Sequence, residues 1–276
     1  MGEARGRRVL VVGTGLLGAS VGLALSGCGN DVQLLDTDLD AVAVAERRGA
    51  GRAWDGTPVD LAVLATPPHV VAECLAKLQQ TGAADAYTDV ASVKQAVLDE
   101  AEELGCDLRR FVGGHPMAGG ETSGPGAARA DLFAGRPWAL CPTSEVEDDA
   151  MDAVLCAVSA TGARPVLCAP AEHDAAVGLV SHAPHMVASA LAATLLDAPP
   201  LALDLAGRGL ADTTRIAAGD VTLWRHIVHR NRAPVADAVR QVADRLTRLA
   251  DDLRVGDADA VEALLAGGAA GRARLG

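Results

Sequence analysis

The sequence predicts an α/β fold in which a doubly wound parallel sheet in the N-terminal part of the chain is followed by an all-helical C-terminal part. Two observations predict it. Up to about residue 170 of the 276, short apolar runs typical of strands alternate with longer segments of helical pattern, as in parallel sheets covered by helices. Beyond that residue only helical patterns follow. We therefore expect two domains, 1–170 and 171–276.

The expected strands are short segments, of which 9–12 and 61–65 are continuous apolar runs, as strands buried on both faces require. They lie at 9–12, 31–35, 61–65, 87–90, 138–141 and 165–168, with helices expected between them at 16–25, 40–48, 69–79, 94–104 and 147–161. The C-terminal helices are expected at 172–197, 219–231, 233–254 and 257–266. Because the stretch 186–196 is apolar on nearly all sides, we expect it to be buried in a bundle or against a second subunit.

The composition excludes several classes of partner. The formal net charge is −12 and the pI is about 4.9, so the surface repels nucleic acids and anionic membranes, and no strong basic patch offsets this. The six cysteines form no C-x-x-C pair and are expected to be buried free thiols in a reducing cytoplasm. No signal-peptide pattern is seen, and no apolar run is expected to reach the roughly 18 residues of a membrane span.

Residues 13–18 read Gly-Thr-Gly-Leu-Leu-Gly and match the pattern G-x-G-x-x-G. The match is informative because it follows an expected strand and opens an expected helix. Gly13 permits a tight turn, Gly15 lets the backbone approach a pyrophosphate, and Gly18 allows close helix packing, while the helix N-terminus faces the phosphates. The pattern predicts a Rossmann-type dinucleotide site. Its expected contacts are Gly13, Gly15, Leu16, Leu17 and Gly18.

The expected second strand ends at Asp36, at the spacing where an acidic residue binds the ribose hydroxyls of a dinucleotide. Its carboxylate repels a 2′-phosphate, and Thr37 and Asp38 supply no compensating arginine, so the sequence favours NAD over NADP. Thr66, which closes the expected strand 61–65, is assigned to the same cofactor site. The alternative is a tight strand–helix turn that binds no ligand.

A histidine lies among glycines in residues 112–121, which read Val-Gly-Gly-His-Pro-Met-Ala-Gly-Gly-Glu. The glycines before His115 let the backbone come close to another group, and Pro116 stiffens the exit. This arrangement favours a histidine that faces a ligand, whereas the alternative is a residue that only caps a loop.

Taken in order, the motifs of this chain resemble those of the prephenate dehydrogenase family, which includes arogenate dehydrogenases. Each motif is moderately specific, and the ordered set is strongly so. Besides the fingerprint at 13–18, the motifs are Thr88–Lys94, Gly114–Gly119 with Glu121 and Ser123-Gly124, His173-Asp174, Ser181–His185, and Asp212–Ala217 with Trp224.

The resemblance implies a nucleotide-binding domain, a helical domain that dimerises, and an active site between them. It also implies oxidative decarboxylation, in which hydride leaves ring C4 of prephenate for NAD and the ring carboxylate leaves as carbon dioxide. Because the product, 4-hydroxyphenylpyruvate, is aromatic, the protein mainly has to orient C4 and remove the hydroxyl proton. The chain stops soon after the helical domain, so no regulatory or mutase domain is expected.

The resemblance also assigns roles to individual residues. His115 is implied as the catalytic residue that accepts the proton of the 4-hydroxyl, and Ser92 as the residue that orients His115 and the hydroxyl. Arg215 is implied to bind a substrate carboxylate through its planar guanidinium. The further substrate-binding candidates are His185, His182, Glu121, Asp212 and Lys94.

Each candidate also has an ordinary structural interpretation. Ser92 suits the N-cap of the following helix, Lys94 a solvated helix surface, and Arg215 a surface ion pair with Asp212. His182 and His185 share a helix face, which can indicate a metal, but no third ligand of suitable spacing accompanies them, so none is predicted.

Other functions remain open at this stage. Arogenate and 4-amino-4-deoxyprephenate allow the same chemistry, and a carboxylate such as Glu121 or Asp212 near the side chain favours an amine. A β-hydroxyacid dehydrogenase usually needs a lysine in its helical domain, and no lysine follows Lys94. A dinucleotide sensor without catalysis is the alternative from another class.

Overall fold

The computed structural model describes residues 6–119 and 122–275, which form two compact units. Unit 1 comprises the described residues up to Val177 together with Ala218–Asn231, and unit 2 comprises Gly178–Ala217 and the described residues from Arg232 onward. This division differs in two respects from the predicted segments 1–170 and 171–276, because unit 1 continues to Val177 and the helical segment 218–231 packs with it.

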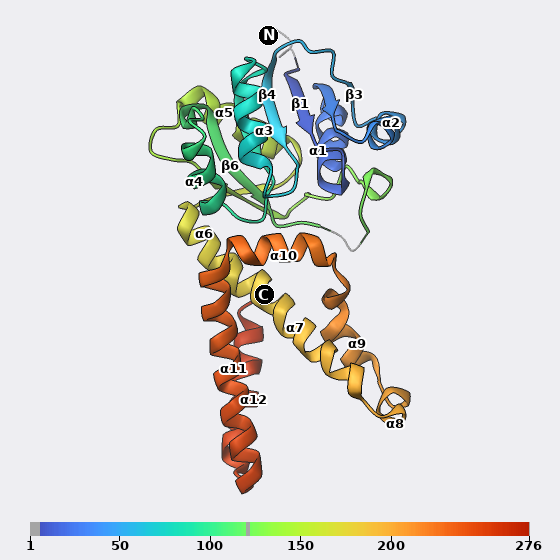
Figure 1. Cartoon of the computed structure of the whole chain (residues 1–276), viewed down its shortest axis with the longest axis vertical. Coiled ribbons are helices and arrows are strands. Elements are labelled where there is room, and N and C mark those ends of the chain that lie inside the picture. The colour runs from blue at the N-terminus through green and yellow to red at the C-terminus, as the bar shows by residue number, and fades with distance from the viewer. Residues whose placement is uncertain (1–5, 120–121, 276) are drawn as a thin grey trace. The chain divides into compact units, whose positions relative to one another are not determined.

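Unit 1 is built on one eight-stranded sheet with the order β3-β2-β1-β4-β5-β6-β7-β8. The strands from β3 to β6 are parallel, β7 runs antiparallel to β6, and β8 is parallel to β7. The bounds are β1 (Arg8–Val12), β2 (Asp31–Leu35), β3 (Arg52–Ala53), β4 (Val59–Leu64), β5 (Ala84–Asp89), β6 (Phe111–Pro116), β7 (Pro137–Cys141) and β8 (Arg164–Leu167). The predicted parallel, doubly wound sheet is thus confirmed (Figure 1).

The prediction missed two strands, β3 and β6. β3 has only two residues. β6 contains Gly113 and Gly114, which lower strand propensity and make the segment resemble a loop. All six residues of β6 are buried, and packing between β5 and β7 overrides the weak local preference. His115 therefore belongs to a buried strand.

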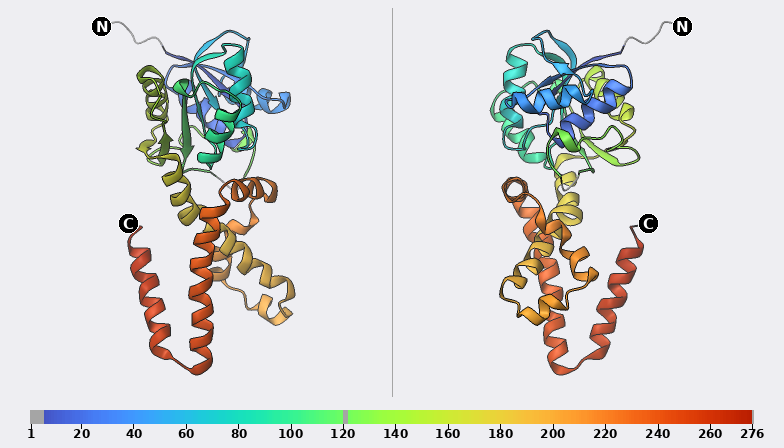
Figure 2. Two further views of the ribbon diagram at one scale, coloured as in Figure 1. Left: turned by 60° about the vertical axis from the view of Figure 1, so that its left-hand side comes forward. Right: turned by 90° about the vertical axis from the view of Figure 1, so that its right-hand side faces the viewer.

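Helices cover both faces of the sheet (Figures 1 and 2). Side chains alternate along each strand, so Val9 and Val11 of β1 join one core cluster and Leu10 and Val12 join the other. The first cluster includes residues of α1 (Leu16–Gly27), α2 (Leu39–Arg47) and α5 (Asp148–Ala160). The second includes residues of α3 (Val71–Gln80), α4 (Gln95–Glu103) and α10 (Val221–Arg230). A further helix, α6 (Pro170–Val177), contacts α4 and β7.

Unit 2 is entirely helical, as predicted. Its helices are α7 (Ala183–Ala193), α8 (Pro200–Asp204), α9 (Arg208–Thr214), α11 (Arg232–Val255) and α12 (Ala258–Ala273), and α11 contacts both α7 and α12. The short helices α8 and α9 were not predicted. A π-helical turn at Gly178–His182 ends two residues before Pro184, which has no N–H to continue the regular bonding pattern.

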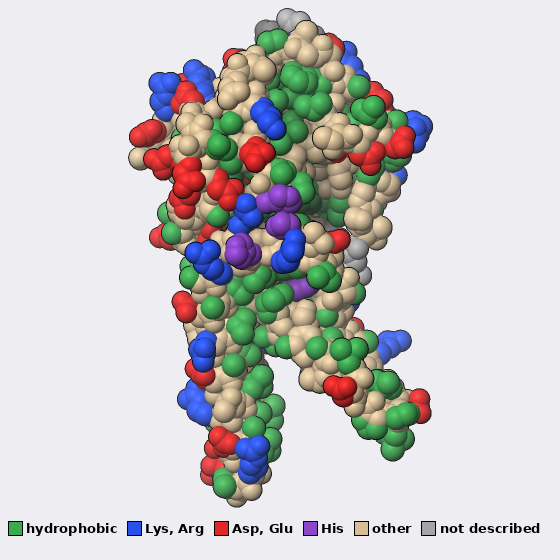
Figure 3. Space-filling model, in the orientation of Figure 1, with side chains coloured by type: hydrophobic (Ala, Val, Ile, Leu, Met, Phe, Trp, Pro, Cys, Tyr) green, Lys and Arg blue, Asp and Glu red, His purple; other side chains and the backbone are tan. Residues whose placement is uncertain are grey.

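Unit 2 leaves many large apolar side chains exposed. Leu196 is 86% exposed and Val255 is 81% exposed, and Figure 3 shows hydrophobic side chains along the helices of this unit. By length and a mean hydropathy of 1.3, the helical stretch Pro170–Asp197 passes the test for a membrane span. This is weak support for a membrane, because apolar helices of assembly interfaces pass the same test.

Candidate active site

Five parallel strands of unit 1 end at the same edge of the sheet, and most of the predicted site residues of this unit lie there. Gly13 follows β1, Asp36 follows β2 and Thr66 follows β4 at one residue's distance. Asp89 ends β5 and His115 lies one residue before the end of β6. Ligands of open α/β sheets bind outside the carboxyl ends of the strands, so this edge is the candidate active site.

The glycines at 13–18 have the geometry that a dinucleotide requires. Gly13 has φ +96°, which only glycine adopts readily. Space around Gly15 is open, since a Cβ added there would meet no atom within 4 Å, whereas a Cβ at Gly18 would collide with the main-chain oxygen of Gly13. The turn therefore holds α1 tightly against β1 and leaves room for a pyrophosphate at Gly15 and at the start of α1, beside Leu16 and Leu17.

Asp36 is held in place by its neighbours. Its Oδ2 accepts hydrogen bonds from the main-chain N–H of Thr14 at 2.6 Å and from the Thr14 hydroxyl at 2.9 Å, and its Oδ1 accepts the N–H of Asp38 at 3.0 Å. Partial burial raises the pKa of Asp36, but the hydrogen bonds from Asp38 and Thr14 outweigh it and hold the pKa below its ordinary value. No arginine donates to this carboxylate among the described residues, so the site fits the ribose of NAD.

A buried ion pair joins β5, β6 and the start of α4. The ammonium of Lys94 pairs with Oδ2 of Asp89 and donates to the main-chain oxygen of Gly114 at 2.6 Å. The other carboxylate oxygen of Asp89 accepts the N–H of Gly114 at 2.8 Å. Both main-chain groups of Gly114 are therefore bound, which fixes the strand directly before His115.

The structure gives Lys94 a role different from the predicted substrate contact. Its side chain is fully buried, as is that of Asp89, and its charge is neutralised within the protein. Because an unpaired buried charge would be costly, the ammonium of Lys94 has to stay bound to Asp89 of β5 and Gly114 of β6. Lys94 therefore links these two strands. The ordinary interpretation, a solvated surface lysine, is excluded as well.

His115 belongs to a buried chain of three side chains. Its Nδ1 lies 2.8 Å from Nε2 of His173, and Nδ1 of His173 lies 2.8 Å from Oδ1 of Asp174. His115 is 7% exposed, His173 3% and Asp174 4%. The two histidines are therefore held by hydrogen bonds in a largely dry environment, where such bonds are strong.

Asp174 also binds three further residues, which lie in two parts of unit 1. Its Oδ1 accepts the N–H of Lys94 at 2.8 Å and its Oδ2 accepts the N–H of Gln95 at 3.0 Å, which caps the first turn of α4. Its main-chain oxygen accepts the side-chain amide of Asn231 at 2.8 Å. The cap of α4 therefore comes from Asp174 and not from Ser92, which is half-buried in the turn after β5.

The contacts that His173, Asp174 and Asp89 make around His115 were not predicted from the sequence. His173-Asp174 was noted only as part of the resemblance, and Asp89 only as part of the motif 88–94. The orienting partner expected for His115 was Ser92, whereas Nδ1 of His115 meets His173. No local pattern reveals this contact, because the two histidines are 58 residues apart.

The remaining predicted substrate residues belong to unit 2 or lie outside the described residues. His182 and His185 are 1% and 4% exposed within the π turn and α7, and burial lowers the pKa of His185. Asp212 lies on α9 and Arg215 directly follows it, both exposed. Glu121 lies outside the described residues. No group of three or more metal-binding side chains occurs in the described parts of the chain.

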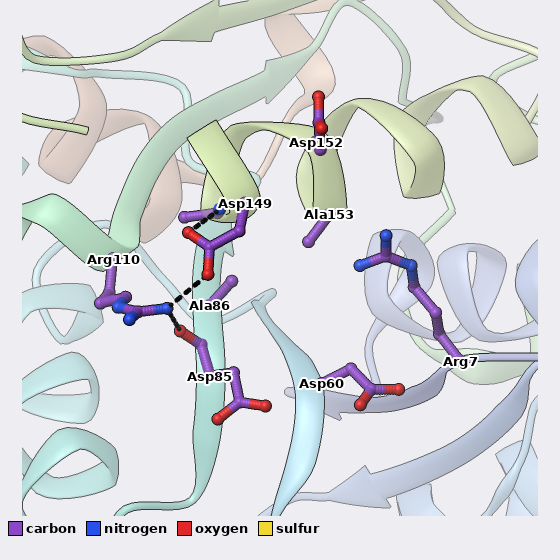
Figure 4. A pocket seen from close by; sticks show the side chains of 9 residues that line it. Arg7, Asp60, Asp85, Ala86, Arg110, Asp149, Asp152 and Ala153 are labelled. Atoms are coloured by element: carbon purple, nitrogen blue, oxygen red, sulfur yellow. Dashed lines mark hydrogen bonds and ion pairs between the residues drawn. The ribbon is translucent and has the colours of Figure 1, made fainter. Parts of the chain in front are cut away.

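A hollow of about 400 Å³ lies at the opposite edge of the sheet (Figure 4). It is lined by acidic residues that include Asp60 and Asp85, near the first residues of β4 and β5, and by Arg110, which binds Asp149 at 3.0 Å. The hollow contains none of the motif residues, and its charges are partly satisfied among themselves. We assign it no role.

The fold and the cofactor edge define a class of protein, the NAD-dependent dehydrogenases with a Rossmann-type domain. Residues 21–167 match the family described as prephenate dehydrogenase, nucleotide-binding domain, and residues 169–267 match prephenate dehydrogenase, dimerization domain. The chain belongs to the prephenate dehydrogenase family and is an NAD-dependent oxidoreductase.

Prephenate dehydrogenases of two bacteria are similar in sequence to this chain. The chain is 41% identical to the probable prephenate dehydrogenase NovF of Streptomyces niveus over 92% of this chain and 71% of that protein. It is 31% identical to prephenate dehydrogenase of Bacillus subtilis over 83% of this chain and 65% of the relative. The Bacillus protein therefore extends well beyond the matched region.

Solved structures are similar over almost the whole chain. Prephenate dehydrogenase from Aquifex aeolicus, in complex with hydroxyphenyl propionate and NAD+, has a TM-score of 0.88 at 28% identity and covers 100% of both chains. Arogenate dehydrogenase from Synechocystis has a TM-score of 0.82 at 27% identity, with 98% of this chain and 100% of that chain covered. A 3-hydroxyisobutyrate dehydrogenase of Mycobacterium tuberculosis, at 14% identity and a TM-score of 0.55 over 90% of this chain and 94% of that chain, shares only the fold.

Proposed function

We propose that this protein is an NAD-dependent prephenate dehydrogenase that converts prephenate to 4-hydroxyphenylpyruvate in tyrosine biosynthesis. The observation that carries the proposal is the position of His115. It lies at the carboxyl edge of the sheet that also carries the dinucleotide turn and Asp36, and a histidine partner holds its ring. A base beside a hydride acceptor is what oxidation of an alcohol requires.

In this reaction the neutral imidazole of His115 accepts the proton of the 4-hydroxyl as hydride leaves ring C4. NAD, when bound, supplies the hydride acceptor. The carbon–carboxylate bond then breaks, carbon dioxide leaves, and its electron pair completes the aromatic ring. The proton held by His115 returns to the oxygen of the new phenolate, so the base is regenerated. Orientation of C4 is the main task of the protein, because the formation of an aromatic ring drives the reaction.

The other assignments remain proposals for the substrate. Ser92 contacts the reacting hydroxyl from the turn after β5, and Arg215 binds a substrate carboxylate bidentately. His182 and His185 line the substrate pocket, with Asp212 near the substrate side chain. In the cofactor site, Leu16, Leu17 and Thr66 contact the dinucleotide beside the glycines.

We also propose that the active form is a homodimer in the cytoplasm. Residues 169–267, which include most of unit 2, match a dimerization domain, and side chains such as Leu196 and Val255 are exposed on unit 2. An exposed apolar surface of this extent is typical of an assembly interface. The cysteines are free thiols, which agrees with a reducing compartment, although Cys28 and Cys156 are exposed and not buried as predicted.

A substrate panel tests the proposed reaction. NAD and NADP are each offered with prephenate, arogenate and 4-amino-4-deoxyprephenate, and the reduced cofactor is followed at 340 nm. Turnover of prephenate with NAD is expected. Turnover of arogenate alone would instead match the activity named for the Synechocystis neighbour, and NAD binding without any turnover would indicate a sensor.

A further inference from the structure

The hydrogen bonds around His115 determine where its proton lies. An ionised carboxylate only accepts hydrogen bonds, so the 2.8 Å contact with Asp174 places a proton on Nδ1 of His173. In the neutral ring, Nε2 of His173 then carries a lone pair. Because this atom lies 2.8 Å from Nδ1 of His115, the proton of His115 is on Nδ1. The lone pair of His115 is therefore on Nε2.

The acceptor role of Asp174 does not depend on the histidine alone. Main-chain N–H groups of Lys94 and Gln95 donate to its two oxygens at 2.8 and 3.0 Å. These groups belong to the first turn of α4, where the helix presents its positive end. Three N–H donors thus converge on one carboxylate, and neither of its oxygens acts as a donor.

We propose that His173 and Asp174 are positioning residues for the proton abstraction assigned to His115. They hold His115 in the form whose Nε2 accepts the hydroxyl proton, and the charge of Asp174 stabilises the cation that results. The proposal rests on the proposed function. The proton passes from the substrate hydroxyl to Nε2 of His115 and later returns, so no other reactant is needed.

This arrangement has the logic of a catalytic triad in which a carboxylate orients a histidine, with a second histidine inserted between the two. Neighbouring charged groups in the described part of the chain make contacts of their own. Asp89 and Lys94 neutralise each other, Glu172 accepts the N–H of Ala169, and β7 contains no charged residue. Among the described residues, Asp174 is the carboxylate that contacts the histidine pair directly.

The proton arrangement can be tested without any substrate. Long-range ¹H–¹⁵N correlation spectra of histidine side chains distinguish protonated from unprotonated ring nitrogens, and loss of signals in His115→Asn assigns the ring. We expect His115 with a protonated Nδ1 and an unprotonated Nε2 above the pH at which it becomes neutral. A proton on Nε2 would overturn the proposal whatever the enzyme's substrate is, which separates this test from the failure of the proposed function.

Kinetics of two substitutions test the acceptor role of His173. His173→Leu removes the acceptor, and we expect kcat to fall about 10- to 100-fold with KM for NAD unchanged. His173→Gln restores an acceptor oxygen near the position of Nε2 and is expected to regain most of this loss. The matched control is His229→Gln, at an exposed histidine of α10. Equal losses in both variants, or no loss in either, would contradict an acceptor role.

The pH profile distinguishes positioning from simple capping of α4. Asp174→Asn keeps an acceptor oxygen for His173 but removes the charge, so protonation of the histidine pair becomes harder. The acid limb of kcat/KM is expected to move to lower pH by about one unit, while the plateau falls. If the limb stays in place while only the plateau falls, Asp174 is a structural cap. Thermal unfolding of the variant confirms that it is folded.

Discussion

The two halves of the carboxyl edge in unit 1 are organised by different means. In the cofactor half, after β1, β2 and β4, the site is formed mainly by the backbone. Space is open at Gly15, and main-chain N–H groups hold Asp36. In the reacting half, after β5 and β6, buried charged side chains hold the site in place. The ion pair of Asp89 and Lys94 fixes Gly114, and Asp174 fixes the histidines.

This difference follows from what each half has to bind. A pyrophosphate needs N–H groups and close approach, which glycines and a helix N-terminus supply locally. A base that removes a proton needs a defined tautomer and orientation, which other side chains must impose. The reacting half is therefore expected to be far more sensitive to the loss of single side chains.

The largest effect is expected for His115→Asn. Asparagine is similar in size but does not take up a proton near neutral pH, so kcat is expected to fall by about 10²- to 10⁴-fold. The dissociation constant of NAD is expected to stay within about twofold, because the cofactor half is untouched. Steady-state kinetics and NAD titration of the same preparation check this. Wild-type kcat in the variant would show that another residue is the base.

The next effect is expected for Lys94→Met, which leaves Asp89 buried without its cation. Removing one partner of a buried pair costs about 3–5 kcal/mol, measured as the loss of unfolding free energy in urea. Lys77→Met, at the other lysine of the chain, exposed on α3, is the control and is expected to change stability by less than about 0.5 kcal/mol.

Tryptophan fluorescence suits this measurement, because all three tryptophans of the chain, at 54, 138 and 224, belong to unit 1. The unfolding of unit 1 is thereby followed separately from that of unit 2. If both lysine variants lost equally little free energy of unfolding, the ion pair would not be what stabilises the reacting half.

The same contrast explains how much of the site the sequence could predict. Asp36 and its partner Thr14 are 22 residues apart within one βαβ unit, so a short motif contains the cofactor site. His115 and His173 are 58 residues apart, and Asp174 and Lys94 are 80 apart. Such contacts exist only after the sheet has formed, and no spacing rule reveals them.

The elements of the fold likewise divide into those that the sequence predicted and those that it did not. The strands and helices with strong apolar patterns were predicted in the right order. The glycine-containing β6 was not predicted as a strand, because packing, not propensity, makes it one. In unit 2 the apolar pattern predicted helices but not α8 and α9, which have only five and seven residues. Helices this short depend on their neighbours rather than on their own sequence.

A smaller effect is expected in the cofactor half for Asp36→Asn. The amide retains an acceptor for a ribose hydroxyl but loses the charge that repels a 2′-phosphate. KM for NAD is expected to rise about 10-fold, as one charge-assisted hydrogen bond allows, and the preference for NAD over NADP to shrink. Asp40→Asn, at an exposed carboxylate of α2, is the control. An unchanged preference would show that Asp36 does not face the ribose.

The smallest effect concerns the pH dependence of NAD binding. Hydrogen bonds from Asp38 and Thr14 outweigh burial and hold the pKa of Asp36 below its ordinary 3.8. Because the pKa is lowered on folding, the stabilising contribution of this carboxylate is fully present above the ordinary value and is lost only as the pH falls through the lower folded value. The carboxylate is therefore ionised throughout the neutral range. The dissociation constant of NAD, measured by fluorescence quenching, is expected to change less than about twofold between about pH 8 and pH 5. A transition near pH 6 that persists in Asp36→Asn would instead place a histidine against the cofactor, and the division of the edge into a backbone half and a side-chain half would then be wrong.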